Sequence, residues 1–252
     1  MGISLDMIAG YIIRFVGPAA AVSVSLGASV LFSPVPWSSA APCPDVQVVF
    51  ARGTGEPEGV GATGQAFIDD LRGREGGKSV DVYAVNYPAS SEWDTGLDGI
   101  RDAGAHVVSM AASCPKTKMV LSGFSQGAAV MGFVTSDAVP AGVDPATVPK
   151  PLGPEIADHV AAVVLFGMPN VRAMNFLGEP PVVIGPTYQA KTIKVCANED
   201  PVCSDGMNFT AHNTYADDAT MIDKGASFAA SRIDTGPAAP ASVAHAPSSF
   251  GN

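Results

Sequence analysis

Residues 118–134 have the sequence KMVLSGFSQGAAVMGFV, which contains the features that best indicate the fold. Residues 118–122 are mostly apolar, which predicts a strand buried in a sheet. Residues 126–134 are apolar with several small side chains, which predicts a helix. The G-x-S-x-G pattern between them needs such a strand–turn–helix junction, because its serine lies on a tight turn that exposes the hydroxyl. Ser125 is therefore a candidate nucleophile, and an ordinary glycine-rich turn is the alternative.

Strand-like and helix-like segments alternate on both sides of this motif. Short runs rich in apolar and β-branched residues predict further strands at residues 45–51, 80–87, 159–166 and 192–196. Apolar residues spaced three and four apart predict helices over 97–111 and 215–229. This alternation implies parallel strands joined by right-handed crossovers, which is a three-layer α/β sandwich.

Two stretches interrupt the alternation. Residues 138–154 cannot form a regular element and predict a surface insertion, because they contain Pro140, Pro145, Pro149, Pro151 and Pro154. Residues 234–252 are rich in Pro, Ala and Ser and predict a disordered tail. The folded domain is therefore expected over residues 42–233.

The first 41 residues have the pattern of an export signal. Arg14 precedes an uncharged apolar run over residues 15–32, and small residues follow at 38–41. A basic residue, an apolar segment and a small-residue cleavage site are typical of a secretory signal peptide. An uncleaved membrane anchor is the alternative, because a run of about 18 apolar residues is just long enough to span a bilayer. Both interpretations place the domain outside the cell or at its envelope.

Composition agrees with one globular domain and argues against a nucleic-acid partner. The chain has 252 residues, of which 47% are hydrophobic and 15% are charged. Its formal net charge of −10 is opposite to what phosphate binding requires. The sequence gives no indication of oligomeric state.

The chain has four cysteines, Cys43, Cys114, Cys196 and Cys203. Disulfides are expected after an export signal, and four cysteines allow three connectivities. Proximity favours Cys196–Cys203, which leaves Cys43–Cys114. No C-x-x-C spacing is present, so we expect no metal site.

Four histidines could serve as the base that a serine nucleophile needs. His106 lies on a predicted helix surface, His159 begins a predicted strand and His245 lies in the tail. His212 stands in a loop before the last helix and follows the Ser…Asp…His order of this architecture. His212 is therefore the candidate base.

The candidate acid is Asp200. It follows the strand at 192–196 and lies between Cys196 and Cys203, where a small disulfide loop would hold its carboxylate against the histidine. Such an acid keeps the imidazole in one tautomer and stabilises its cation. Glu199 and Asp205 are the nearby competitors.

Two backbone amides are candidates for binding a developing oxyanion. The N–H of Gln126 is expected at a helix N-terminus, and Thr54 lies in the glycine-rich loop after the first strand. The glycines of this loop do not form a dinucleotide fingerprint, because Glu58 occupies the third glycine position. We therefore expect no dinucleotide, and no other cofactor.

Over about residues 43–233 the chain resembles the cutinase family of α/β-hydrolases, and its mycobacterial members in particular. The resemblance is carried, in order, by ARGT at 51–54, GFSQGA at 123–128, CANEDPVC at 196–203 and HNTY at 212–215. Phe124 replaces the more usual Tyr, and the proline-rich insertion departs from the fungal pattern. The resemblance implies a five-stranded parallel sheet, little or no lid, and hydrolysis of carboxylic esters through an acyl-enzyme.

The substrate is the least determined part of the prediction. Val182, Val183, Ile184 and Phe209 are apolar candidates for a groove and favour short to medium acyl chains, although core packing explains them equally well. The expected partner is an ester or lipid, with contact to a lipid surface or the cell envelope. Phospholipase A, thioesterase and acetylxylan esterase activities are alternatives, as is a non-catalytic envelope-binding role.

Overall fold

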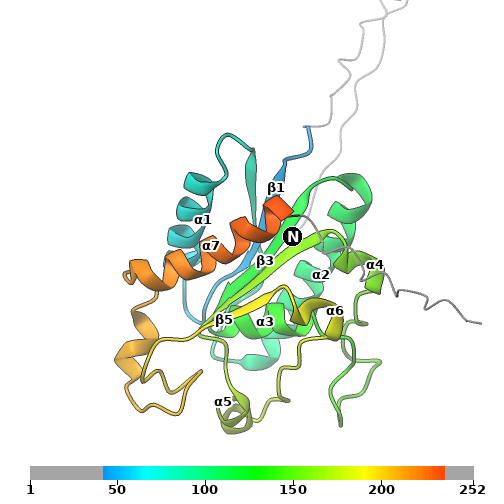
Figure 1. The fold of residues 1–252 in the computed structure, drawn as a ribbon. Helices are drawn as coiled ribbons and strands as arrows, with labels where there is room; N and C mark the ends of the chain where they lie inside the picture. Colours follow the sequence, from blue (N-terminus) through cyan, green and yellow to red (C-terminus); the bar gives the residue numbers. More distant parts are fainter. Residues whose placement is uncertain (1–41, 236–252) are drawn as a thin grey trace, which may run out of the picture. The chain divides into compact units, whose positions relative to one another are not determined.

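The computed structural model describes residues 42–235, and these form a five-stranded parallel sheet between two layers of helices (Figure 1). The strand order is β2-β1-β3-β4-β5, which confirms the predicted three-layer α/β sandwich. The predicted export signal and residues 236–252 of the predicted tail lie outside the described residues. The strands are β1 (Val46–Ala51), β2 (Val80–Ala84), β3 (Lys118–Phe124), β4 (Val160–Phe166) and β5 (Thr192–Val195).

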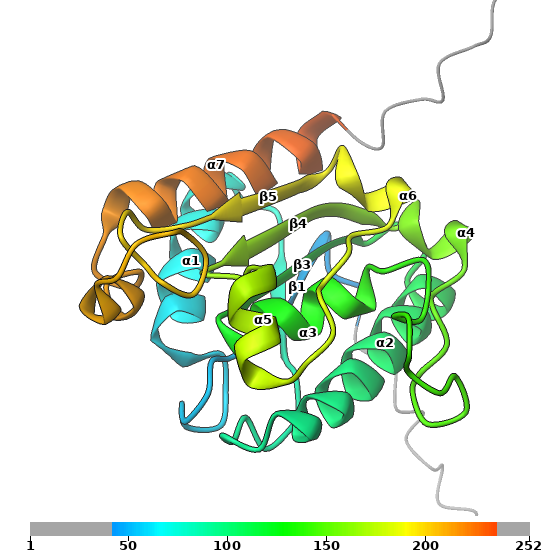
Figure 2. The ribbon, with the colours of Figure 1, turned by 90° about the horizontal axis from the view of Figure 1, so that it is seen from below.

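Helices α1 and α7 cover one face of the sheet, and α2 and α3 cover the other (Figure 2). The short helices α4, α5 and α6 follow in the second half of the chain. None of the helices described is long and apolar enough to cross a membrane. The helices are α1 (Gly61–Arg74), α2 (Gly96–Ser113), α3 (Gln126–Val134), α4 (Pro154–Ala157), α5 (Val171–Leu177), α6 (Pro186–Gln189) and α7 (Ala219–Thr235), with 3₁₀ turns η1 (Trp93–Thr95) and η2 (Phe209–Asn213).

The central strands are buried on both faces, which explains their continuous apolar sequences. Successive side chains of a strand point to opposite faces. Val49 and Leu121 accordingly join the core beneath α2 and α3, whereas Phe50 and Val120 join the core beneath α1 and α7. Both faces of β1 and β3 are thus fixed by packing, and the loops at their ends start from rigid positions.

Three predicted boundaries are wrong. The folded domain does not end at residue 233, because α7 continues to Thr235 and the carboxylate of Asp234, placed in the predicted tail, pairs with Lys78. The helix predicted from Tyr215 begins at Ala219, because the carboxylate of Asp218 accepts the N–H groups of Thr220 and Met221 and so caps the helix there. The strand predicted over 80–87 ends at Ala84, and two residues later a backbone N–H bonds to a side chain of α2 instead of to a strand.

The turn between β3 and α3 has a strained geometry. Ser125 has φ 53° and ψ −118°, a conformation that non-glycine residues rarely adopt. A Cβ added to Gly127 would lie 2.0 Å from the carbonyl oxygen of Ala51, and one added to Gly123 would lie 2.4 Å from that of Gly127. Only glycine therefore allows α3 to begin this close to β1 and β3.

The proline-rich segment contains turns but no helix or strand before α4. A guanidinium nitrogen of Arg101 in α2 donates a hydrogen bond to the carbonyl of Thr147 at 2.9 Å. Leu152, near the end of the segment, packs against the core beneath α2 and α3. The segment is thus fastened to the outside of this helical layer.

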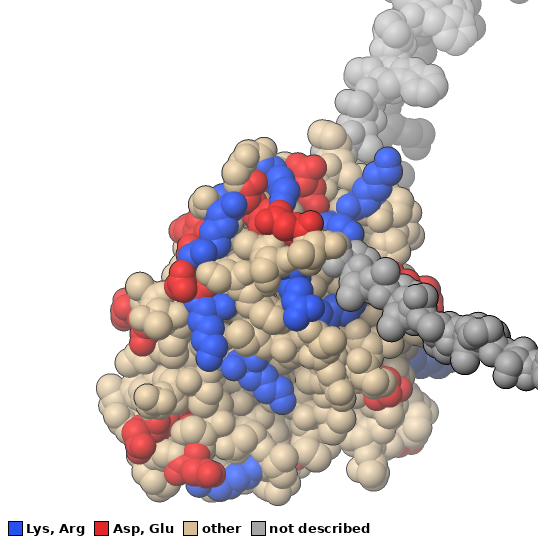
Figure 3. Space-filling view, in the orientation of Figure 1, with Lys and Arg blue, Asp and Glu red and all other residues tan. Residues whose placement is uncertain are grey.

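Charged side chains of both signs lie together over α1 and α7 (Figure 3). Arg74 pairs with Asp70 at 2.9 Å and with Asp223 at 2.6 Å, and Lys78 pairs with Asp234 at 2.5 Å. Exposed pairs of this kind add little stability. Their charges are mutually compensated, so this face offers no patch of one sign.

The two disulfides are Cys43–Cys114 and Cys196–Cys203, the pairing that proximity favours. The first joins the segment before β1 to the C-terminal end of α2 across 71 residues of sequence. The second closes a small loop after β5.

Replacing both Cys43 and Cys114 by alanine should lower the free energy of unfolding by about 4 kcal/mol, because the bridge restricts a long loop in the unfolded chain. Guanidinium-induced unfolding of the wild type and the double variant measures the difference. A loss below about 1 kcal/mol would contradict this expectation.

Gly127→Ala should lower the free energy of unfolding by about 1–3 kcal/mol or prevent folding, because the new methyl group meets the backbone of β1. The matched control is Gly73→Ala in α1, where an added Cβ meets nothing within 4 Å. Alanine is the better helix former, so the control should be neutral or more stable than the wild type. Equal thermal stability of the two variants would contradict the steric argument.

Candidate active site

Three segments that are distant in sequence bring Ser125, His212 and Asp200 into one hydrogen-bonded chain. His212 Nε2 lies 2.9 Å from Ser125 Oγ, and His212 Nδ1 lies 2.8 Å from Asp200 Oδ2. The carboxylate is fully buried, whereas the imidazole keeps 16% of its surface exposed. The arrangement has the order and distances of a serine nucleophile, a base and an orienting acid.

Each member of this chain is held by the element that carries it. Ser125 occupies the strained turn after β3, and its N–H donates to the carbonyl of Phe166 at 2.9 Å. His212 lies in η2, and its ring stacks on Phe124 with centroids 5.1 Å apart. Asp200 lies in the loop after β5. All three therefore lie where strands end, the usual position of sites in open parallel sheets.

The Asp200 carboxylate accepts several hydrogen bonds. Oδ1 accepts the N–H of Val202 at 2.8 Å, and Oδ2 accepts the hydroxyl of Tyr215 at 2.7 Å in addition to His212. A buried charge is costly unless such donors surround it. The contacts both stabilise the carboxylate and fix its direction.

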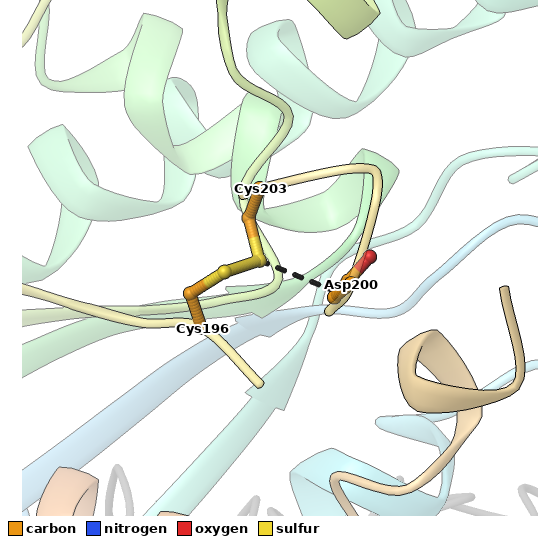
Figure 4. Close-up of side chains that lie close together, drawn as sticks. All are labelled: Cys196, Asp200 and Cys203. Atoms are coloured by element: carbon orange, nitrogen blue, oxygen red, sulfur yellow. Dashed lines mark hydrogen bonds between the residues drawn. A yellow bond between two sulfur atoms is a disulfide. The ribbon is translucent and has the colours of Figure 1, made fainter. Parts of the chain in front are cut away.

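The Cys196–Cys203 disulfide closes the loop that carries this acid. Figure 4 shows Asp200 beside it, with Oδ2 3.3 Å from Cys203 Sγ. Cys203 Sγ has no proton to donate because it is in the disulfide, so this is a close contact and not a hydrogen bond. Both sulfurs are committed to the bridge, and the cluster of Cys196, Asp200 and Cys203 therefore offers no thiolate to a metal.

Tyr215 is a functional neighbour that the sequence analysis missed. Its hydroxyl donates to Asp200 and accepts the N–H of Ala197 at 3.0 Å. Burial raises the pKa of the Tyr215 phenol well above its usual range, and the adjacent carboxylate acts in the same direction. The tyrosine thus stays protonated and able to donate. Its position directly after the histidine loop was the available signal, because a buried tyrosine needs a partner for its hydroxyl.

The competing acids do not reach the imidazole. Glu199 is exposed and has φ 63°, and Asp205 is also exposed. Neither side chain contacts His212 within hydrogen-bonding distance.

The other described histidines have structural contacts elsewhere. His106 stacks on Tyr83 with centroids 3.5 Å apart, and its Nε2 lies 2.7 Å from Gln47 Oε1. Burial lowers the pKa of His106. His159 Nδ1 lies 3.2 Å from a backbone carbonyl near the start of β3. His245 lies outside the described residues.

The two amides expected to bind an oxyanion are both available. Gln126 is the first residue of α3, and Thr54 is exposed in the loop after β1. Within residues 42–235, neither backbone N–H donates to another group. Both N–H groups can therefore donate hydrogen bonds to an oxygen that develops negative charge.

The Thr54 loop is held by an arginine and a glutamate that the sequence analysis did not single out. Arg52 donates to the carbonyls of Glu56 and Tyr87 at 2.9 and 2.8 Å. One carboxylate oxygen of Glu56 accepts the N–H of Gly53 at 2.6 Å. These bonds fix the backbone on both sides of Thr54.

The apolar residues expected to line a groove have separate positions. Val182 packs against Gly132 of α3, and Ile184 is buried, so both belong to the core. Val183 and Phe209 are 59% and 69% exposed. The described residues instead enclose a cavity between α2, α3 and the proline-rich segment.

Comparisons with known proteins identify the family of the chain. The family model described as Cutinase matches residues 42–233. The Mycobacterium tuberculosis protein named Probable carboxylesterase Culp5 is 58% identical over 167 residues, which are 66% of this chain and 95% of that protein. Phospholipase Culp4 of the same organism is 44% identical over 208 residues, which are 82% of this chain and 87% of that protein.

A solved structure of Trichoderma reesei cutinase in complex with a C11Y4 phosphonate inhibitor is 29% identical, with a TM-score of 0.54. The likeness covers 76% of this chain and 78% of that chain. The matched region of the family model contains every residue of the hydrogen-bonded chain described above. The protein therefore belongs to the cutinase family.

Proposed function

We propose that this protein is a secreted serine esterase that hydrolyses carboxylic esters of short to medium acyl chains. The observation that carries the proposal is the continuous hydrogen-bonded chain from Ser125 through His212 to the buried Asp200. Two of its relatives are named a probable carboxylesterase and a phospholipase, which supports an ester-hydrolysing activity.

In the first half of the reaction, Ser125 Oγ forms a bond to the ester carbonyl carbon while His212 Nε2 takes the hydroxyl proton. The tetrahedral intermediate collapses when the bond to the alcohol breaks, and His212 returns the proton to the leaving oxygen. The acyl group then remains bonded to Ser125. Asp200 holds the Nδ1 proton of the imidazole and stabilises the cation that forms.

In the second half, water takes the place of the alcohol. His212 accepts a proton from the water, whose oxygen bonds to the acyl carbon. The tetrahedral intermediate collapses when the bond to Ser125 Oγ breaks, His212 returns the proton to that oxygen, and the carboxylic acid leaves. The amides of Thr54 and Gln126 bind the oxyanion in both halves. A single donor of this kind is worth about 10²–10³ in turnover.

The export pattern over residues 1–41 and the two disulfides support an extracellular or envelope location. Apolar side chains are exposed on α5 and on the loop that leads to His212, namely Phe176, Met207 and Phe209. Such side chains support contact with a lipid or polymer surface. Phospholipase A activity is the second candidate, because Culp4 is named a phospholipase.

Ser125→Ala, His212→Ala and Asp200→Asn should each lower kcat/KM on p-nitrophenyl esters by about 10³-fold or more, because the three residues act as one unit. The series from acetate to palmitate, compared with phospholipid and thioester turnover, measures the substrate class.

Matched controls come from the competing residues. His159→Ala and Asp205→Asn should keep activity near that of the wild type, because neither side chain contacts the site. Wild-type turnover in the Ser125→Ala variant would overturn the proposal.

Tyr215→Phe should lower kcat about tenfold with little change in KM, because it removes one donor from the Asp200 carboxylate, an interaction worth about 1.5 kcal/mol. The control is Tyr188→Phe, whose buried hydroxyl has no partner in the described structure. Steady-state kinetics on a butyrate ester measures both. An unchanged kcat in Tyr215→Phe would show that the other bonds suffice to orient the acid.

A further inference from the structure

A cavity of about 250 Å³ lies between α2, α3 and the proline-rich segment. Small-molecule sites are typically about 300–1,000 Å³, and a cavity of about 150 Å³ is enough to hold benzene. The walls are mainly apolar and include Leu97, Ile100, Ala129, Phe133, Val143 and Leu152. This space is unusual beside helices that otherwise pack closely on a sheet.

The cavity is lined by Gln126, the residue after Ser125, whereas Ser125 and His212 themselves are not among its lining residues. Gln126, the neighbour of Ser125, lines one end, and the successive helical positions Ala129 and Phe133 continue the wall along α3. From Gln126 to Val134 the helix rises about 12 Å at 1.5 Å per residue. The lining residues of α3 therefore extend about 12 Å from Gln126, whose amide is the proposed oxyanion donor.

Polar side chains also line the cavity. Asp94 precedes α2, Glu179 follows α5, and both line the cavity. Burial raises the pKa of Glu179, and the charge of Asp94 adds to the effect, so the two carboxyls lie near each other. Gln126 Oε1 is buried and lacks a partner among the described residues. Around Phe133 and Leu152 the wall is mainly apolar and also includes Ser136, Thr147 and Lys150.

The proline-rich segment forms the outer wall. Val139, Val143 and Leu152 line the cavity from this side, and the bond from Arg101 to Thr147 fastens the segment over it. Gly104 of α2 also contributes to the far end, where an added Cβ would meet only Leu152, at 3.9 Å. The missing side chain at Gly104 leaves part of this space open.

We propose that this cavity binds the acyl chain of the substrate ester, with the carbonyl at Ser125 and the chain running along α3 beneath the proline-rich segment. The inference rests on the proposed esterase function and deepens it. A mainly apolar wall that includes the residue after Ser125 fits a fatty acyl chain. The rival arrangement places the chain on the exposed surface near Val183.

The cavity sets an expected chain length. An extended alkyl chain with bonds of about 1.5 Å at tetrahedral angles advances roughly 1.3 Å per carbon, so about 12 Å accepts about nine carbons. Each added methylene that leaves water should raise kcat/KM by up to about fourfold. The wild-type kcat/KM should thus rise from butyrate to a maximum near octanoate or decanoate.

Gly104→Leu tests the proposal because it fills the far end without touching the triad. Its kcat/KM on a decanoate ester should fall at least tenfold, while that on butyrate should stay within about twofold of the wild type. Gly73→Leu in α1 is the matched control and should leave both values unchanged. Val183→Ser tests the rival arrangement and should leave the decanoate-to-butyrate ratio unchanged.

A second variant keeps the test decisive if Gly104→Leu does not fold. Phe133→Ala enlarges the same cavity and should move the maximum toward longer chains. An unchanged chain-length profile in the folded variants, or a ratio that responds to Val183→Ser instead, would overturn the cavity proposal. The Ser125→Ala variant separates the two proposals. If it loses activity while the chain-length profile stays unchanged in the cavity variants, the cavity proposal fails and the esterase function stands. If it retains activity, the esterase function itself is overturned.

Discussion

The backbone contact between the start of α3 and the end of β1 is the constraint on which the site depends. Gly127 lies so close to the carbonyl of Ala51 that no side chain fits between them. This contact sets the tight turn in which Ser125 adopts its strained conformation, and it brings the first amide of α3 beside the loop of Thr54. Ser125, the proposed nucleophile, and both proposed oxyanion donors therefore share one rigid junction. Strain of this kind persists only where the surrounding structure enforces it.

The acid side of the site is built differently, from a loop after the edge strand β5 that a disulfide closes. A disulfide closes the loop around Asp200, and the carboxylate is fixed by donors from Val202, Tyr215 and His212. Because these donors come from both sides of the loop, the buried charge organises the chain between β5 and α7. The hydrogen bonds that offset the cost of burying the carboxylate also orient it toward the imidazole.

Much of this arrangement could be predicted from the sequence, because its signals are local. The elbow, the disulfide-framed Asp200 and the alternation of strands and helices all depend on short-range patterns. Tyr215 could not be assigned its contact, because its spacing also fits the stripe of the following helix, and the cap at Asp218 decides where that helix begins. The cavity could not be predicted at all. It results from how three segments pack, and no single segment carries a pattern for it.

The proline-rich segment is attached in a way that lets its sequence vary without disturbing the rest of the site. It contributes a wall to the cavity, yet it pairs with no strand, and one bond from Arg101 fastens its middle to α2. Its length and side chains can therefore change while the junction at Ser125 and the acid loop keep their geometry. With the acyl chain in this cavity, as proposed above, the residues for the chemistry and those for chain-length preference lie on different segments. A set of enzymes with different preferences could be made by exchanging residues 138–152 alone.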